Sequence, residues 1–333
     1  MAESTLSLTF AQLQVAVADY LGLGRTLANW STDDTSRIDD IIKRGTQQFY
    51  LPPPIPGEKM SHQWTFMKPL TSIIVWATVT SATADVQGSP STTLQSTVDA
   101  PFHASMIGKS FTFDTSGNSY EITAYASTSS VTITPILDAA DSGQDFTITA
   151  DGDYRLPDDV ADIEGDMQFD LDDGFGPVKG VSQGIIKRLR ARSDTTSHPE
   201  IYSIVPLTTD GVLGQRSDLM LYPEPDTDYT LHYSYIIMPD KLSASLYAYG
   251  ASVHSDTLEA SCLAMAELER DEGRGARWQL WIERLMASVA VDRKRVPDSF
   301  GRHGDGLSNR SRNLPDRNFD RIVTFNGIDY SEG

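Results

Sequence analysis

Residues 71–150 differ so sharply from the rest of the chain that they constrain the fold more than any other feature. Of these 80 residues, 28 are Ser or Thr, and Lys109 is the only Lys or Arg. Short runs of alternating apolar and polar residues recur there between turn signals such as Gly88-Ser-Pro90 and Ser116-Gly-Asn118. The pattern predicts a small antiparallel β domain, either a sandwich or a barrel. Its strands are expected at 73–79, 110–113, 120–124, 131–134 and 146–149.

Helical patterns flank this stretch on both sides. Thr9 and Gln12 have the spacing of a capping box, and apolar residues follow at helical spacing until Gly22. A second helix is expected to begin after Ser31 or Thr32 and to end before the prolines at 52–54. Near the other end, two apolar stripes joined by the short link 271–275 predict an antiparallel helical hairpin. Residues expected to pack this hairpin, or to form a subunit interface, are Leu258, Met265, Trp278, Trp281, Ile282 and Leu285.

The fold class is therefore expected to be α+β. A helical-bundle core would carry an inserted small antiparallel β domain and an extended C-terminal tail. We expect a helical N-terminal part of the core at 1–69 and the inserted sandwich-like or barrel-like domain at 70–150. The rest of the core would occupy 151–299, with an acidic turn region, a helix near Ser182, strands at 201–205, 219–222 and 229–237, and the hairpin; the tail would be 300–333.

The charge balance limits the partners of the chain. It has 46 acidic and 27 basic residues, a net charge of −19, and 151–173 alone holds ten acidic residues against Arg155. Tight binding to nucleic acid requires Lys and Arg to neutralise phosphates, so it is not expected, although an acidic wall can line a passage through which DNA slides. A single cysteine, Cys262, excludes an internal disulfide. No signal peptide or membrane-length apolar run is present, so we expect a soluble protein made in a cytoplasm.

Motifs for catalysis or metal binding are weak. Gly180-Val-Ser182-Gln-Gly184 matches the nucleophile elbow of hydrolases, but a turn rather than a buried strand is expected before it. Ser182 as a helix cap is therefore favoured, and a hydrolase using Ser182 remains the less favoured alternative. A calcium-loop pattern beginning at Asp170 fails, because Val181 stands where a bidentate Glu is required. We expect no catalytic residue, no metal site and no cofactor.

Four segments together resemble the head-to-tail adaptor proteins of tailed bacteriophages. The strongest is the run Leu-Tyr-Pro-Glu-Pro-Asp at 221–226, followed by the Tyr-Thr-Leu strand at 229–231. The others are 41–49 with the aromatic element at 64–66, the Leu-Pro turn within 153–159, and the closing hairpin with Asp271, Arg274, Ala276 and Trp278. Together they cover most of residues 5–299.

The resemblance implies a non-enzymatic virion protein of the phage neck, assembled in the host cytoplasm. Such adaptors form a ring, twelvefold in the family, that docks beneath the portal and joins the capsid to the tail. The implied partners are copies of the same chain, the portal protein, a downstream tail or neck protein, and double-stranded DNA that passes through the lumen without specific binding. The β insertion would contact capsid or fibres, and no membrane is involved. Rival interpretations are a stopper or tail-tube component, or a binding module whose β domain recognises glycan or protein.

This interpretation assigns roles to two sets of residues. The acidic side chains expected to face the lumen are Asp158, Asp159, Asp162, Glu267, Glu269, Asp271 and Glu272. The tail residues expected to dock on the portal are Arg302, Arg310, Arg312, Arg317, Phe319, Arg321, Ile322 and Phe325, which combine cations with apolar anchors.

Overall fold

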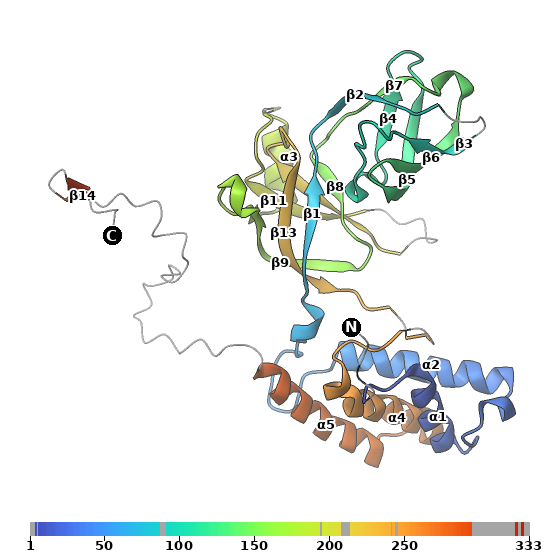
Figure 1. The fold of residues 1–333 in the computed structure, drawn as a ribbon. Coiled ribbons are helices and arrows are strands. Elements are labelled where there is room, and N and C mark those ends of the chain that lie inside the picture. Colours follow the sequence, from blue (N-terminus) through green and yellow to red (C-terminus); the bar gives the residue numbers. More distant parts are fainter. Residues whose placement is uncertain are drawn as a thin grey trace. The chain divides into compact units, whose positions relative to one another are not determined.

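The structure is a computed structural model that describes residues 4, 6–86, 91–193, 195–207, 214–240, 242–243 and 246–294, with the backbone of 324–325 and 328–329. Residues Met1–Val289 form one unit and Ala290–Gly333 a second. The described residues form five α-helices and several mainly antiparallel sheets, which confirms the α+β class (Figure 1).

Capping side chains define the first two helices, as predicted. Helix α1 spans Phe10–Leu21, and Thr9 and Gln12 form a reciprocal capping box at its start. Helix α2 spans Thr32–Tyr50, where Ser31 and Asp34 form a second capping box. These contacts satisfy backbone N–H groups that would otherwise have no partner in the first turn of each helix.

The closing hairpin consists of α4, Ser255–Asp271, and α5, Ala276–Arg293. Thr257 Oγ1 lies 2.5 Å from Ser288 Oγ, while Glu267 near the other end of α4 contacts the start of α5, so the helices are antiparallel as predicted. Helix α4 also packs against α1 and α2. Apolar side chains from these elements form one core that includes Leu13, Val17, Ile38, Ile41, Phe49, Leu258, Cys262, Trp281 and Leu285.

The Ser- and Thr-rich stretch forms a six-stranded antiparallel sheet. Its strands are β2 (Val79–Thr83), β3 (Ser91–Gln95), β4 (Ser110–Phe113), β5 (Ser119–Ser127), β6 (Ser130–Leu137) and β7 (Asp145–Ile148), in the order β2-β7-β4-β5-β6-β3. The N–H of Asp85, just after β2, donates to the carbonyl of Gln95 at 2.8 Å and brings the two edge strands together. The sheet thus curls toward a barrel around Phe102, Phe111, Phe113 and Phe146, all buried.

One predicted strand is wrong. The pattern at 73–79 is split between β1, Leu70–Val75, and β2, which belong to different sheets. Strand β1 pairs with β13, Tyr229–Ile237, whose other neighbour is β9, Val160–Phe169, so the sheet order is β1-β13-β9. Between the two strands, Trp76 is buried and the N–H of Ala77 donates to Asp228 Oδ1 at 3.1 Å. At Trp76 the chain therefore passes from the three-stranded sheet to the six-stranded sheet.

The structure also differs from the predicted acidic turn region, because part of that region forms strand β9. Ile163 and Met167 are buried on this strand, whereas Asp162, Glu164 and Asp166 are exposed. Asp162, Glu164 and Asp166 therefore occupy solvent-facing positions of a strand.

A four-stranded sheet completes the first unit, in the order β10-β11-β12-β8. The strands are β8 (Asp153–Arg155), β10 (Lys179–Gly180), β11 (Ile201–Pro206) and β12 (Ser217–Tyr222). Helix α3, Gln183–Arg190, packs against β11 and β12, close to where a helix was predicted. In the second unit, the backbone of β14, Thr324–Phe325, pairs with β15, Ile328–Asp329.

Candidate functional site

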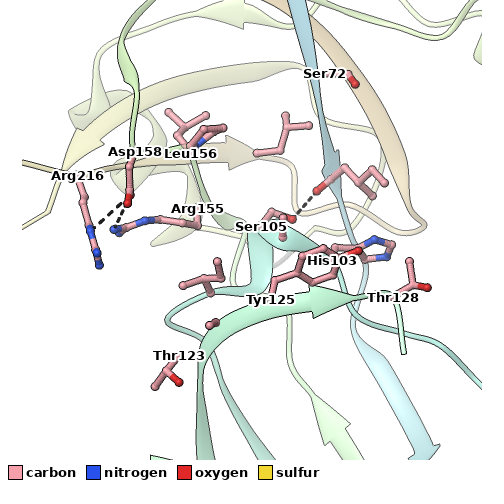
Figure 2. Close-up of a pocket in the computed structure, with 16 residues that line it drawn as sticks. Ser72, His103, Ser105, Thr123, Tyr125, Thr128, Arg155, Leu156, Asp158 and Arg216 are labelled. Carbon is pink, nitrogen blue, oxygen red and sulfur yellow. Dashed lines mark hydrogen bonds and ion pairs between the residues drawn. The ribbon is translucent and has the colours of Figure 1, made fainter. Parts of the chain in front are cut away.

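A pocket of about 660 Å³ lies where the β1 strand, the six-stranded sheet and the β8–β9 turn meet. Ser72 on β1, His103 beside the short helix Ala104–Met106, Tyr125 on β5 and Leu156 line it from separate segments (Figure 2). The lining is mainly apolar, with Ile74, Ile107, Leu156 and Pro157. Such a mixture of apolar wall and few polar groups is typical of a binding pocket.

Charged groups occupy one end of this pocket. The Arg155 and Arg216 side chains lie 3.7 and 3.5 Å from Asp158 Oδ1 (Figure 2). Arg155 also lies 3.6 Å from Asp218 Oδ1. Burial raises the pKa of Asp218, although Lys109 and Arg155 counteract it. At the opposite wall, His103 Nε2 lies 3.2 Å from Asp228 Oδ2, and this contact lowers the pKa of Asp228.

The contacts of Ser105 and Ser182 bear on the hydrolase alternative. The Ser105 hydroxyl in the pocket donates to the carbonyl of Ile74 at 2.6 Å, so it is engaged by the backbone and not by a base. Ser182 lies elsewhere, exposed at the N-cap of α3, and the described residues place neither a histidine nor a carboxylate in hydrogen bond with it. A nucleophile elbow needs such a base, so the geometry lends the hydrolase alternative no support.

The acidic residues expected to line a lumen fall into two groups. Asp158, Asp159, Asp162, Asp271 and Glu272 are exposed. Some of these have local partners as well: Asp159 accepts a hydrogen bond of 2.8 Å from the Tyr235 hydroxyl, and Asp271 lies 3.7 Å from Arg270. The side chains of all five remain accessible to solvent.

Glu267 differs from this group, because its side chain is only 6% exposed. Its carboxylate accepts hydrogen bonds of 3.0, 3.1 and 3.0 Å from the backbone N–H groups of Gly275, Arg277 and Trp278 at the start of α5. Burial would raise the pKa of Glu267, but these three donors outweigh it and hold the pKa below its usual range. Glu267 therefore caps α5 inside the hairpin, which corrects its assignment as a lumen-facing charge.

Glu269 is also engaged within the fold. Its carboxylate lies 2.8 Å from Arg37 Nε and makes a second, very short contact with Arg44. Burial would raise the pKa of Glu269, but the two guanidinium groups lower it overall. The residue links α4 to α2 and is a weaker lumen candidate than its exposed neighbours.

The six hairpin residues named from the sequence all lie in or against the helical core. Leu258, Trp281 and Leu285 are buried, and Met265, Trp278 and Ile282 pack against the core while partly exposed. The Arg274 guanidinium lies over the Trp278 ring at 4.3 Å. Met265, Trp278 and Ile282 therefore retain exposed surface, which is compatible with a subunit contact as well.

The portal-docking residues cannot be placed in the same way. Arg302, Arg310, Arg312, Arg317, Phe319, Arg321 and Ile322 lie outside the described residues, and only the backbone of Phe325 is described. Their docking role therefore remains a prediction.

Sequence reasoning missed the pocket and one protruding side chain. The pocket combines residues 72–216 from distant segments, and no local pattern marks such a meeting point. Leu171, between Asp170 and Asp172, is 97% exposed. An isolated apolar residue within a run of acids was the signal that could have identified it.

The described residues hold neither a metal-binding cluster nor a membrane-spanning helix. Across residues 6–294 with their gaps, no group of three or more His, Cys, Asp or Glu side chains has a metal-binding arrangement. Within that same part of the chain, no helix combines the length and the apolar character needed to cross a membrane.

Comparison with known proteins relates the chain to a protein family. A search of curated proteins found no match to the chain. A family model described as "SU10 adaptor protein" matches residues 8–302, a range that contains helices α1 to α5 and strands β1 to β13. The chain belongs to the SU10 adaptor protein family.

Proposed function

We propose that this protein is a structural adaptor of a bacteriophage virion, located in the neck between the capsid portal and the tail. The observation that carries the proposal is the family match over residues 8–302. The finer elements of the proposal are a ring of identical copies, twelvefold in symmetry, that docks on the portal and receives a downstream tail or neck protein. The β barrel would then contact capsid or fibres.

The ring would enclose a lumen through which the genome passes. Exposed carboxylates on β9 and at the α4–α5 link support this, because the candidates Asp162, Asp271 and Glu272 present negative charge to solvent. Like charges repel DNA phosphates, so a wall of carboxylates would not hold the duplex by counterion release. The proposal needs no catalytic group and no cofactor.

Negative-stain imaging of the purified protein, at several concentrations and with or without the portal ring of its phage, tests the proposal. The expected result is rings with a central hole, alone or seated on the portal, from which the symmetry is counted. Monomers that ignore the portal at every concentration would overturn the ring and its place in the neck.

A further inference from the structure

Strand β1 lies at one end of the sheet order β1-β13-β9, so only one of its two edges is paired with another described strand. Just before β1, the carbonyl of Pro69 accepts a hydrogen bond of 3.2 Å from the N–H of Tyr235. Bonded residues alternate along an antiparallel pair, so the odd-numbered residues of β1 bond to β13. The backbone N–H and C=O groups of Leu70, Ser72 and Ile74 therefore point away from β13.

These outward groups have one protein partner among them. The carbonyl of Ile74 accepts a hydrogen bond of 2.6 Å from the Ser105 hydroxyl. The other outward groups, which are the N–H groups of Leu70, Ser72 and Ile74 and the carbonyls of Leu70 and Ser72, form no hydrogen bond with another described residue. Leu70 is 72% exposed and Ile74 39%. Such a row of donors and acceptors is a template on which a further strand pairs.

The opposite edge of the same sheet is protected. On β9, the N–H of Ile163 donates to Asp162 Oδ1 at 2.9 Å, and Met167 exchanges backbone hydrogen bonds of 3.0 and 2.8 Å with Val178. Exposed acids and a shift in register also interrupt β9. Charges, irregularities and covering segments of this kind are the usual protection of an edge strand.

Strand β1 lacks that protection. Its sequence, Leu-Thr-Ser-Ile-Ile-Val, contains no charged residue and no proline, and it pairs with β13 in unbroken register. β-Branched residues fill four of its six positions, which favours the extended conformation. An edge that is exposed, regular and uncharged indicates a partner strand.

The pocket of about 660 Å³ lies along this unprotected edge. Ser72 and Ile74 belong to its lining, and so does Ser105, which bonds the outward carbonyl of Ile74 (Figure 2). Tyr125 and Leu156 line the same space from other segments. Ligand pockets measure about 300–1,000 Å³, so this one has room for a short peptide segment and not for a folded domain.

The charged end of the pocket is balanced. The side chain of Arg155 is 10% exposed and lies 3.7 Å from Asp158 and 3.6 Å from Asp218. Arg216 lies 3.5 Å from Asp158. Two cations thus face two carboxylates, and the end selects neither sign of charge. The remaining lining is mainly apolar, so the matching occupant is uncharged.

We infer that β1 binds an extended, uncharged peptide segment of another protein, which pairs with Leu70, Ser72 and Ile74 as a fourth strand of this sheet. Backbone hydrogen bonds supply the affinity, and every second side chain of the segment enters the pocket, which selects apolar residues. The inference concerns the single chain and does not depend on the proposed ring.

The β1 edge of a second copy is the rival occupant. A single extended segment can reach an edge that lies between pocket walls at Tyr125 and Leu156. A second folded copy would bring its own walls to the contact, and these would have to pass within the strand spacing of about 4.8 Å. The geometry therefore favours a segment that is not part of a folded sheet.

A synthetic peptide tests the site on the full-length protein. The probe is Thr-Val-Thr-Val-Thr-Val-Thr with an acetylated N-terminus and an amidated C-terminus. We expect saturable binding by isothermal titration calorimetry, and hydrogen exchange at the amides of Ser72 and Ile74 that is slowed by about tenfold or more. The control peptide carries N-methyl groups on two adjacent central residues, which removes a donor from each of its edges. It should bind about tenfold more weakly or worse.

Substitution at Ser72 tests the same contact from the side of the protein. Ser72→Pro removes an outward N–H and leaves the bonds of the odd-numbered residues to β13, so it should weaken peptide binding by about tenfold. The matched variant, Ser72→Val, keeps that N–H and should bind the peptide at parental strength or more tightly. Urea unfolding verifies that both variants fold.

Three results would overturn the inference. The first is equal binding of the two peptides to the parent protein, which is decisive whether or not Ser72→Pro folds. The second is no saturable binding of the probe up to about 1 mM. The third is protection of the Ser72 and Ile74 amides that grows with protein concentration in the absence of peptide, because it would assign the edge to a second copy.

Discussion

Gly45 on α2 lies so close to Cys262 on α4 that no Cβ fits between them. A Cβ placed on Gly45 would sit 2.6 Å from the Cα of Cys262 and 2.8 Å from its Sγ. The preceding residue of α4, Ser261, donates from its hydroxyl to the Gly45 carbonyl at 2.8 Å. The two helices therefore meet through backbone atoms at this point, and the helical core depends on the missing side chain.

Gly45→Ala should destabilise the protein. In an exposed helix the change would stabilise by about 1 kcal/mol, because Ala has the higher helix propensity. Here the added methyl group meets backbone that cannot move aside, and overpacking of this kind costs about 1–3 kcal/mol. Urea unfolding followed by circular dichroism measures the difference.

Gly184→Ala is the matched control for this change. Gly184 also lies in a helix, α3, but a Cβ there would meet nothing within 4 Å. Its substitution should leave the free energy of unfolding unchanged or slightly higher. A Gly45→Ala variant as stable as Gly184→Ala would contradict the close approach of α2 and α4.

Glu267→Gln should weaken the α4–α5 hairpin in a pH-dependent way. The carboxylate accepts three backbone hydrogen bonds, and bonds to a charged acceptor contribute about 1.5–3 kcal/mol each at most, so a loss of about 1–3 kcal/mol at pH 7 is expected. The folded-state pKa lies below the usual 4.5, so this stabilisation is complete above that pH and disappears as pH falls through the folded pKa.

The measurement is the difference in unfolding free energy between the parent and Glu267→Gln from pH 7 down to pH 3. Asp271→Asn serves as the control, because Asp271 is exposed at the end of the same helix. It should shift stability by less than about 0.5 kcal/mol across this range. A difference for Glu267→Gln that stays constant with pH would show that the charge of Glu267 is not what the hairpin uses.

Cys262 should be inert toward thiol reagents in the folded protein. Its side chain is fully buried, and burial raises the pKa of the thiol to about 12, so thiolate is scarce at pH 8. Labelling with a chromogenic disulfide should be slow in buffer and complete in denaturant. Ser72→Cys, at an exposed position, provides a fast-reacting reference, and equally fast labelling of the parent would contradict burial of Cys262.

Local signals predicted the helices of this fold well. The Thr9–Gln12 capping box, the Ser31 N-cap and the Gly22 stop act between residues close in sequence, so the pattern contains all the information. The strands β4, β11 and β13 were found for a similar reason, since each alternates or carries β-favouring residues. None of these required knowledge of a distant partner.

The features that the sequence did not predict all depend on contacts between distant segments. Strand β9 was hidden because acids fill its exposed positions, and only pairing with β13 shows that Ile163 and Met167 face a core. The change of sheets at Trp76 depends on Asp228, which is far away in sequence. The sequence predicts an exposed charge at Glu267, because acids at a helix end usually are exposed, and its hydrogen-bond partners lie beyond the hairpin link.

Removal of the tail tests its proposed docking role. Truncation after Phe300 deletes the cations and apolar residues expected to reach the portal while leaving α5 complete. We expect rings of the truncated protein to form but to bind the portal at least tenfold more weakly in co-sedimentation. Retained docking at parental strength would contradict the role assigned to Arg302, Arg310, Arg312, Arg317, Phe319, Arg321, Ile322 and Phe325.

Charge reversal at the exposed acids tests the lumen. Asp271→Lys combined with Glu272→Lys places two cations where the parent has two exposed carboxylates, and each new cation can bind a DNA phosphate and release its counterions. We expect virions that assemble normally but eject DNA more slowly, with the delay shrinking as salt is raised, because salt screens the new attraction. The matched control, Asp145→Lys with Glu121→Lys on the six-stranded sheet, also reverses two exposed acids but on the barrel, so ejection should keep its parental rate. Parental ejection kinetics in the Asp271 and Glu272 variant, with the substitutions verified in the virion, would remove these two residues from the lumen.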